Sequence, residues 1–290
     1  VVFIIGVVCM AIGKCDGQLL DGADYVVDLH NKVRRYIGKQ QIANMNKISW
    51  DPLLAVEAAT LATCRKLGFA PPEVTYDELG KATRGMNFAV GGENDTLSKF
   101  IRQWFTERRH YDRDFNMCYG NRQCSNYMQM VNAESNRIGC AMKPDCSRNG
   151  RRLKYFVCVY SPGINWEELY KSGPACSKCP DSAPFCQAGL CVPCDRQNTS
   201  QCECRKTCHK RNVGYGKLNG KTCTCSCVYG RGPNCDEECS NPEQYMDFDI
   251  CNTIPSSACQ NSDPTVKQML KEFCPMKCSC NPIPQVLKWF

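Results

Sequence analysis

The chain has 290 residues, including 26 cysteines, and its formal net charge at pH 7 is +7. A cysteine content this high is typical of disulfide-built proteins from an oxidising compartment and argues against a reducing one. The charge excess is small for a chain of this length, so we expect no nucleic-acid partner.

The first residues, VVFIIGVVCMAIG, form an apolar run that is too short to span a bilayer as a helix. Ala11 and Gly13 place small residues at the spacing of a signal-peptidase site. We therefore interpret residues 1–15 as the remainder of a signal peptide and expect a secreted, extracellular protein. Because no later apolar run reaches membrane length, we do not expect an integral membrane protein.

The first of three predicted helices covers residues 24–38, DYVVDLHNKVRRYIG. Its apolar side chains recur at helical intervals, at Tyr25, Leu29, Val33 and Tyr36. We expect Asp24 to be the N-cap and Gly38 to end the helix.

Two further helices and two strands complete the predicted core of residues 16–171. Asp51 and Pro52 begin the second helix as N-cap and first-turn residue, and the third covers residues 95–109. RIGCAM and KYFVCVYSP, at residues 137–142 and 154–162, have the composition of strands. Helices followed by strands predict an α+β layered core with its own hydrophobic interior.

From Cys176 onward the composition changes. Twelve cysteines fall between Cys176 and Cys235, and six more between Cys239 and Cys280. Segments this poor in large aliphatic residues need crosslinks to fold, which predicts small disulfide-rich modules after the core. We place their boundaries at residues 172–236 and 237–290.

The first region resembles the CAP superfamily, which includes cysteine-rich secretory proteins, insect venom antigen 5 and plant pathogenesis-related proteins. The resemblance covers residues 20–171 and rests on ordered motifs: LHNKVR, ISWDPLLAVEAATLATC, QWFTE with Tyr111-Asp112, NYMQMV followed by RIGCA, and YFVCVYSPGIN. It implies an α-β-α sandwich. It also implies that NYMQMV, within residues 124–140, is the active-site strand of the family.

The residues with which the family holds a divalent metal are largely replaced here. The two histidine positions correspond to Gly68 and Asn126, and one glutamate position corresponds to Met86. Glu107 matches, whereas Glu93 is a nearby substitute at a different spacing from Trp104. One carboxylate cannot hold a metal or complete an acid/base pair. The resemblance therefore implies a degenerate cleft with no metal, no cofactor and no enzymatic activity.

The three histidines leave alternatives open. His30 lies in a structural motif and fits helix packing. His110 follows Glu107 by three residues and either shares a helix face with it or makes a surface contact. His209 follows Cys208, where zinc ligation competes with disulfide formation.

The resemblance also implies three disulfides in the first region, Cys64–Cys146, Cys140–Cys158 and Cys118–Cys124. Two sequons, at Asn94 and Asn198, predict glycosylation on surface loops of a secreted chain.

Residues 172–236 resemble the cysteine-rich hinge of CAP proteins followed by an EGF-like module, and residues 237–290 resemble ShK-like toxin domains. Lys267 is followed by Gln268, so the Lys–aromatic pair of channel-blocking ShK domains is absent. The run RKTCHKRNVGYGK, residues 205–217, either meets an anionic surface or is a solvated loop. The apolar tail VLKWF either inserts into an interface or frays.

We therefore expect a secreted, non-enzymatic protein that binds an extracellular protein or ion channel, as a venom or salivary effector would. The alternative is carriage of a sterol or other lipid, seen in some members of the family. Phe115, Met117, Tyr119 and Tyr127 would line the lipid loop in that case, or belong to the core.

Overall fold

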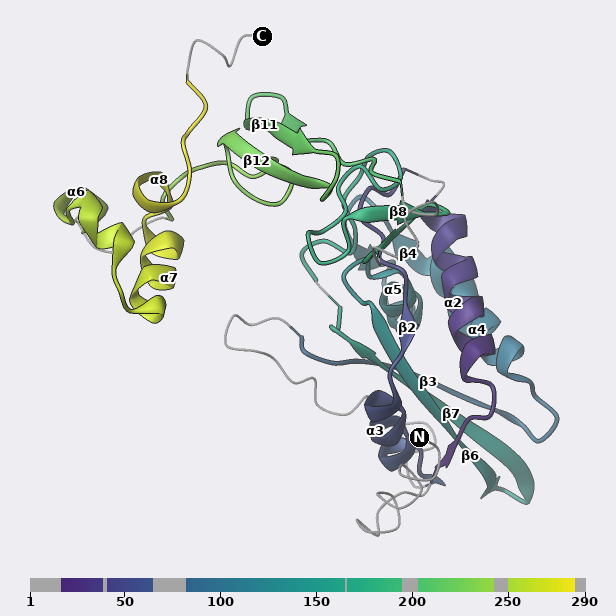
Figure 1. The fold of residues 1–290 in the computed structure, drawn as a ribbon. Coiled ribbons are helices and arrows are strands. Elements are labelled where there is room, and N and C mark those ends of the chain that lie inside the picture. The colour runs from purple at the N-terminus through teal and green to yellow at the C-terminus, as the bar shows by residue number, and fades with distance from the viewer. Residues whose placement is uncertain are drawn as a thin grey trace. The chain divides into compact units, whose positions relative to one another are not determined.

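The computed structural model describes residues 17–38, 41–64, 82–164, 166–194, 203–242 and 250–284 (Figure 1). Contacts divide the chain into two compact units, described separately below. Unit 1 comprises Val1–Ala175 with Ala188–Cys191, and unit 2 comprises Cys176–Gln187 with Val192–Phe290. Unit 1 therefore takes in residues 172–175 and 188–191, which lie beyond the predicted boundary at residue 171. None of the helices in the described residues combines the length and apolar character needed to cross a membrane.

A five-stranded sheet forms the middle layer of unit 1. Its strands are β1 (Gln18–Leu19), β2 (Ser49–Trp50), β3 (Gly85–Gly92), β6 (Arg137–Arg148) and β7 (Arg151–Ser161). The strands run in the order β1-β6-β7-β3 with antiparallel pairing, and β2 pairs parallel to β6. The long β6–β7 hairpin forms the centre of this sheet.

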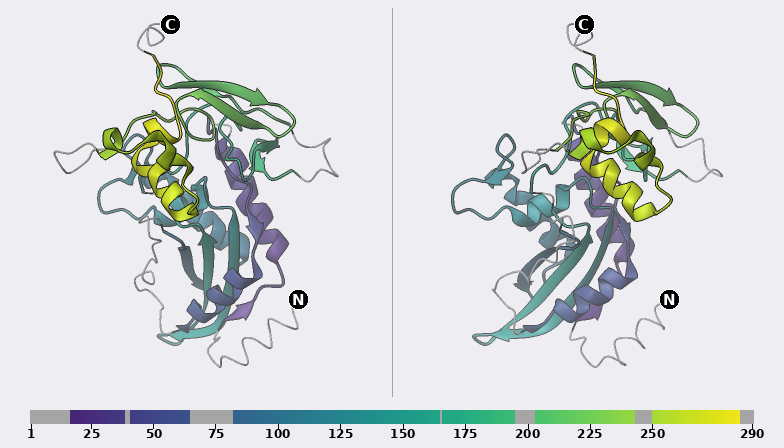
Figure 2. Two further views of the ribbon diagram at one scale, coloured as in Figure 1. Left: turned by 60° about the vertical axis from the view of Figure 1, so that its left-hand side comes forward. Right: turned by 90° about the vertical axis from the view of Figure 1, so that its left-hand side faces the viewer.

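Helices cover both faces of the sheet (Figures 1 and 2). Side chains of β7 alternate between the faces, with Tyr155, Val157 and Val159 on one and Phe156, Cys158 and Tyr160 on the other. The first set packs in a cluster with α3 (Pro52–Leu61). The second packs with α2 (Ala23–Gly38), α4 (Leu97–Thr106) and α5 (Ser125–Val131). The predicted α+β sandwich is confirmed, because a strand buried on both faces needs a helix layer on each.

All three predicted helices form, with a different cap on the first and different bounds for the third. The third is predicted over residues 95–109, but α4 covers Leu97–Thr106 and a 3-10 turn follows from Glu107. Asp51 accepts hydrogen bonds from Leu53 N and Leu54 N at the start of α3, and Pro52 occupies its first turn. Gly38 is the last residue of α2. The predicted N-cap of α2 is wrong: the helix begins at Ala23, so Asp24 lies in its first turn. A carboxylate there still stabilises the helix through its dipole.

The predicted strand at NYMQMV is also wrong, because Ser125–Val131 is the helix α5. All residues from Asn126 to Val131 are buried. A short segment buried on every side has no solvent face, so its hydrophobic pattern cannot separate helix from strand. The strand of this motif begins later, at Arg137.

Within the described residues, three disulfides join pairs of unit 1 cysteines between Cys64 and Cys158, and they are the pairs that the resemblance implies. Cys64–Cys146 has a sequence separation of 82, and Cys140–Cys158 joins directly paired residues of β6 and β7. Cys118–Cys124 joins β5 (Met117–Cys118) to the residue before α5. Asn94 is exposed between β3 and α4, and Asn198 lies outside the described residues. Glycosylation at both sites stays a prediction.

Unit 2 is built from small elements and closely spaced disulfides. Its strands are β8 (Phe185–Gln187), β10 (His209–Lys210), β11 (Gly214–Asn219) and β12 (Thr224–Tyr229), while β9 (Leu190–Val192) begins in the segment assigned to unit 1. Its helices are α6 (Ile250–Thr253), η4 (Ser256–Gln260), α7 (Pro264–Phe273) and α8 (Pro275–Cys278). Its disulfides include Cys176–Cys186, Cys204–Cys223, Cys208–Cys225, Cys227–Cys235, Cys239–Cys280, Cys251–Cys274 and Cys259–Cys278. The EGF-like and ShK-like assignments stay predictions.

Candidate functional site

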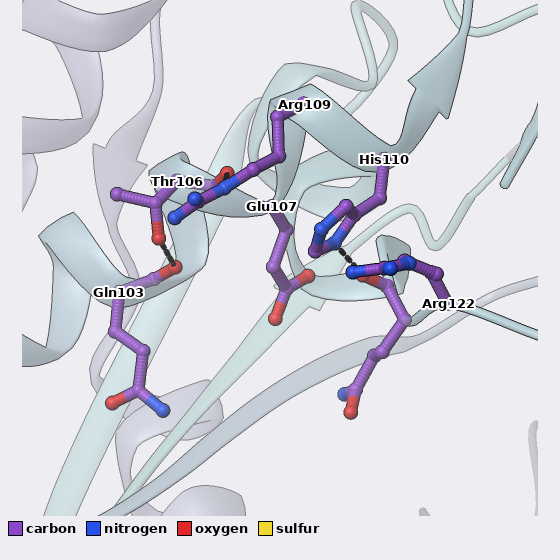
Figure 3. A pocket seen from close by; sticks show the side chains of 7 residues that line it. Gln103, Thr106, Glu107, Arg109, His110 and Arg122 are labelled. Atoms are coloured by element: carbon purple, nitrogen blue, oxygen red, sulfur yellow. Dashed lines mark hydrogen bonds between the residues drawn. The ribbon is translucent and has the colours of Figure 1, made fainter. Parts of the chain in front are cut away.

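A polar cavity of about 410 Å³ lies where α4 ends, and it contains the one family ligand that the sequence retains. Glu107 begins the 3-10 helix η2 (Glu107–His110) directly after α4. The side chains around the cavity are Gln103, Thr106, Glu107, Arg109, His110, Arg122 and Gln123 (Figure 3). The turn of η2 and the segment before α5 thus bring acidic and basic groups together.

Both oxygens of the Glu107 carboxylate are engaged by the start of α5. Asn126 Nδ2 donates to Oε1 at 2.8 Å, and the backbone N–H of Tyr127 donates to Oε2 at 3.2 Å. That N–H belongs to the first turn of α5, where it has no acceptor inside the helix. The residue before α5, Cys124, provides no side-chain cap. Glu107 therefore acts as a cap for α5 from a different element.

Burial raises the pKa of the Glu107 carboxyl above its ordinary value, while the hydrogen bonds from α5 and the charge of His110 act in the opposite direction. Desolvation is the larger influence because the side chain is partly buried. A carboxylate in this state has two donors already bound. It is poorly placed to act as a metal ligand or a general base.

Three basic side chains share the cavity with Glu107. His110 and Arg122 point toward its carboxylate, whereas Arg109 turns toward Thr106 (Figure 3). His110 Nδ1 lies 3.2 Å from the carbonyl oxygen of Gln123, and Arg109 Nε donates to the carbonyl of Thr106 at 3.2 Å. The two guanidinium groups in this lining repel a divalent cation.

The four predicted ligand positions do not come together as one site in the described residues. Asn126 contacts Glu107, as above, but Met86 packs with α3 on the opposite face of the sheet. The β3 residue that reaches α5 is the next one, Asn87, which donates to the carbonyl of Asn126 at 2.9 Å. Gly68 lies outside the described residues. Glu93 forms an exposed ion pair with Arg152 at 3.2 Å.

Arg109 and Arg122 were missed by sequence reasoning. In the sequence, the run ERRH at residues 107–110 indicates a charged end of a helix and does not indicate that Arg109 lines a cavity. Arg122 enters the cavity through a turn in which its N–H donates to the carbonyl of Tyr119. The disulfide Cys118–Cys124 closes the segment that contains Arg122. The position of Arg122 in the cavity therefore depends on a crosslink and not on a local sequence motif.

The other two histidines have no role in this cavity. His30 is fully buried, with Nδ1 at 2.8 Å from the carbonyl of Val26 and Nε2 at 2.8 Å from the hydroxyl of Tyr160. His209 is exposed on β10, and its neighbour Cys208 is paired with Cys225. A disulfide sulfur is not a zinc ligand, so zinc ligation by Cys208 is excluded.

Three of the four predicted lipid-loop residues are exposed. Phe115, Met117 and Tyr119 lie on the hairpin of β4 (Tyr111–Asp112) and β5, and Phe115 is 75% exposed. Tyr127 differs: it is 6% exposed, within α5, and packs in the core. The core reading holds for Tyr127 because α5 points that side chain toward Phe105 and Tyr111.

A second, apolar groove of about 260 Å³ lies between α2 and α4. Its lining residues are Leu29, Lys32, Val33, Tyr36, Ser98, Ile101, Arg102 and Phe105. The guanidinium of Arg108 lies 4.4 Å from the centre of the Phe105 ring. The groove combines an apolar floor with the cationic side chains of Lys32 from α2 and Arg102 from α4.

Comparisons with known proteins identify the family of the chain. The family model described as "CAP: Cysteine-rich secretory protein family" matches residues 27–160. Peptidase inhibitor 15 of Gallus gallus is 35% identical over 187 residues, which cover 58% of this chain and 69% of that protein. The cysteine-rich venom protein helothermine of Heloderma horridum horridum is 30% identical over 217 residues, which cover 70% and 83%. The cysteine-rich venom protein VAR5 of Varanus acanthurus is 32% identical over 180 residues, which cover 60% and 78%.

Proposed function

Because the chain belongs to the cysteine-rich secretory protein (CAP) family, we propose that it is a secreted, non-enzymatic protein that binds an extracellular or membrane target. Two of its relatives, helothermine and VAR5, are named as venom proteins. Their names support a role as a venom effector. We propose in addition that the target is an ion channel. The fold and the family do not by themselves identify the target of a protein. Further support for the proposal comes from the residues of the candidate site.

The observation that carries the non-enzymatic proposal is the state of Glu107. Its two carboxylate oxygens hold the start of α5, at 2.8 Å from Asn126 Nδ2 and 3.2 Å from Tyr127 N. The remaining groups around the cavity are mainly cationic or amide side chains. Because this carboxylate caps a helix, we infer that the residues of the family cleft stabilise the fold here and do not carry out catalysis.

The proposal is tested by applying the full chain to voltage-clamped excitable cells. We expect a reversible change in a whole-cell current that survives EDTA treatment and the substitution Glu107→Gln. Glutamine keeps one acceptor for α5 but cannot ligate a metal as a carboxylate. Loss of the effect on EDTA treatment, or in a Glu107→Gln variant with an unchanged melting temperature, would contradict a non-enzymatic, metal-independent mode of action.

Zinc calorimetry on chelator-treated protein provides an independent check. We expect no tight site, because Asn126 donates rather than ligates and Arg122 adds positive charge beside Glu107. Stoichiometric zinc binding that is lost in Glu107→Gln would contradict the proposal.

Lipid carriage is the second candidate, and the groove between α2 and α4 favours it. Leu29, Val33 and Ile101 supply apolar contacts, while Lys32 and Arg102 could pair with an acidic head group. A fatty acid fits this pattern better than a neutral sterol. Exposed Phe115, Met117 and Tyr119 support membrane contact during loading of either lipid.

Lipid extraction and mass spectrometry of the full chain, secreted from a eukaryotic host, test this candidate. Ser98→Trp fills the groove and should remove the bound lipid, whereas Ser147→Trp, on an exposed position of β6, should not. An equal lipid content in both variants and the unsubstituted protein would place any bound lipid elsewhere.

A further inference from the structure

Unit 2 contains a long stretch of chain without acidic residues. Between Glu203 and Asp236, the 32 residues include seven lysines and arginines and no aspartate or glutamate. This stretch forms the three-stranded antiparallel sheet β10-β11-β12 (Figure 1). A sheet of this composition has positive potential wherever its cations are not neutralised by neighbouring segments.

Four of the seven cations have partners from other parts of unit 2. The pairs are Arg205 with Glu203, Lys206 with Asp181, Lys210 Nζ with the carbonyl of Asp236, and Arg231 with Glu237. The side chains of Arg211, Lys217 and Lys221 are exposed and form no ion pair or hydrogen bond with any described residue. Three cations therefore remain available to a partner.

The packing of β11 sets the direction of these side chains. Gly214 and Gly216 are buried, and a Cβ at either position would overlap Cys235. Because side chains alternate along a strand, Tyr215 and Lys217 point to the opposite, outer face. His209 is paired with Tyr215 across the strands and shares that face.

The cations follow the length of β11 instead of converging on one point. Arg211 lies in the turn before β11, Lys217 lies on its outer face, and Lys221 lies in the turn after it. The six residues of β11 span about 20 Å at ~3.4 Å per residue. Disulfides Cys208–Cys225 and Cys227–Cys235 crosslink β12, the strand paired with β11, so little ordering is needed on binding.

We propose that the outer face of this sheet binds a sulfated polysaccharide along β11. An extended polyanion matches a line of cations, whereas a single phosphate would need cations that converge. Tyr215 and His209 can pack against sugar rings between the sulfate contacts. A lipid surface fits less well, because Leu218 lies on the face opposite Lys217 and leaves few apolar groups to insert. This site is distinct from the cavity and the groove of unit 1, and would retain the protein at a cell surface or matrix.

The test is heparin affinity of the full chain across a sodium chloride series. We expect binding that weakens linearly with the logarithm of salt concentration, as counterion release requires. The triple substitution Arg211→Gln, Lys217→Gln and Lys221→Gln should weaken binding at least tenfold and flatten the salt dependence. The charge-conserving variant Arg211→Lys, Lys217→Arg and Lys221→Arg should bind within threefold of the unsubstituted chain.

A matched control removes three cations from the other unit. Lys143→Gln, Arg148→Gln and Arg151→Gln carry the same loss of charge on the β6–β7 hairpin. If this control weakens binding as much as the unit 2 variant, the proposal is overturned, since net charge alone would then explain retention. Equal binding to fully desulfated heparin, or tighter binding to phosphatidylserine vesicles than to heparin, would also overturn it.

Discussion

Two basic side chains, His30 and Arg34, lie one helical turn apart on α2, and both are fully buried. Arg34 donates to five backbone carbonyls, those of Asn46, Met130, Asn132, Ala133 and Ser135. Desolvation lowers its pKa to about 9. Three of these carbonyls surround the end of α5, where helix carbonyls lack internal partners. Arg34 thus joins α2 to α5 and the loop after it.

We expect Arg34→Lys to lower the free energy of unfolding by roughly 2–4 kcal/mol, because an ammonium with three donors leaves buried carbonyls unpaired. Chemical denaturation of the full chain measures the effect. Arg35→Lys is the matched control: Arg35 makes only a 3.7 Å pair with exposed Asp28, so its loss should be below about 0.5 kcal/mol. Equal effects at the two positions would contradict this role for Arg34.

His30 gives the core a dependence on pH. Its Nδ1–H must donate to Val26 O, and its Nε2 accepts from the Tyr160 hydroxyl, so the neutral tautomer satisfies both neighbours. Burial lowers the pKa of His30 to about 4 from its ordinary value of 6.5, and the nearby charge of Arg34 acts in the same direction. The unfolded chain therefore binds more protons between those values, and stability rises with pH across that interval.

We expect the His30 contribution to be fully present above pH 6.5 and to decline by about 3 kcal/mol as pH falls to 4. Urea denaturation at several pH values measures the slope. His30→Gln should flatten it, and His209→Gln, which removes an exposed histidine of β10, is the matched control. Glu107 acts in the opposite direction because its pKa is raised, so the comparison between variants, not the total slope, is decisive. A slope unaltered by His30→Gln would refute this assignment.

At the scale of elements, α3 packs directly on the backbone of β6. A Cβ on Gly139 would overlap the backbone of Leu54 and Ala55. The absence of a side chain thus allows the helix to approach the strand closely, with Ala58 and Ala59 continuing the same contact. One glycine therefore sets the spacing between two layers of the sandwich.

Gly139→Ala should destabilise unit 1 by at least ~2 kcal/mol, since the overlapping atoms are backbone and cannot move aside. Gly92→Ala is the control, because a Cβ there would have no neighbour within 4 Å. Thermal unfolding followed by near-ultraviolet circular dichroism distinguishes them. Similar melting temperatures for the two variants would show that α3 can shift without cost.

At the scale of the whole molecule, unit 1 is completed by residues from the cysteine-rich part of the chain. Leu190 is 0% exposed and belongs to the core cluster of α2, α4 and α5. Cys191 N donates to Met45 O at 2.8 Å, and Lys47 N donates to Cys191 O at 2.9 Å. A chain that ends at residue 171 lacks this strand-like contact.

We expect a fragment of residues 16–171, secreted from a eukaryotic host, to fold with its three disulfides but to unfold more easily than a fragment of residues 16–191. The loss of a buried leucine and two backbone hydrogen bonds should cost roughly 2–5 kcal/mol. Leu190→Ala in the full chain should show a loss in the same range. Identical stability of the two fragments would mean that residues 188–191 are not part of the unit.

Much of unit 1 follows from local pattern. The caps at Asp51 and Pro52, the apolar spacing of Leu97, Ile101 and Trp104, and the alternation along residues 154–162 all operate between near neighbours. Met86 illustrates the limit of such patterns. A motif match assigned it to the cleft, but the register of β3 against β7 turns it toward α3.

The sequence by itself determined the layered α+β class and the presence of a cysteine-rich, crosslinked region after the core, because these depend on composition and short-range spacing. Only the tertiary structure decided that NYMQMV is a helix, that Glu107 caps it, that Arg109 and Arg122 line the cavity, and that Leu190 completes the core. The helix is selected by its burial on every side, and the other three features join residues that are not neighbours in sequence. Such contacts form only when folding brings the distant segments together, because only then are the side chains buried and their polar groups in need of hydrogen-bond partners.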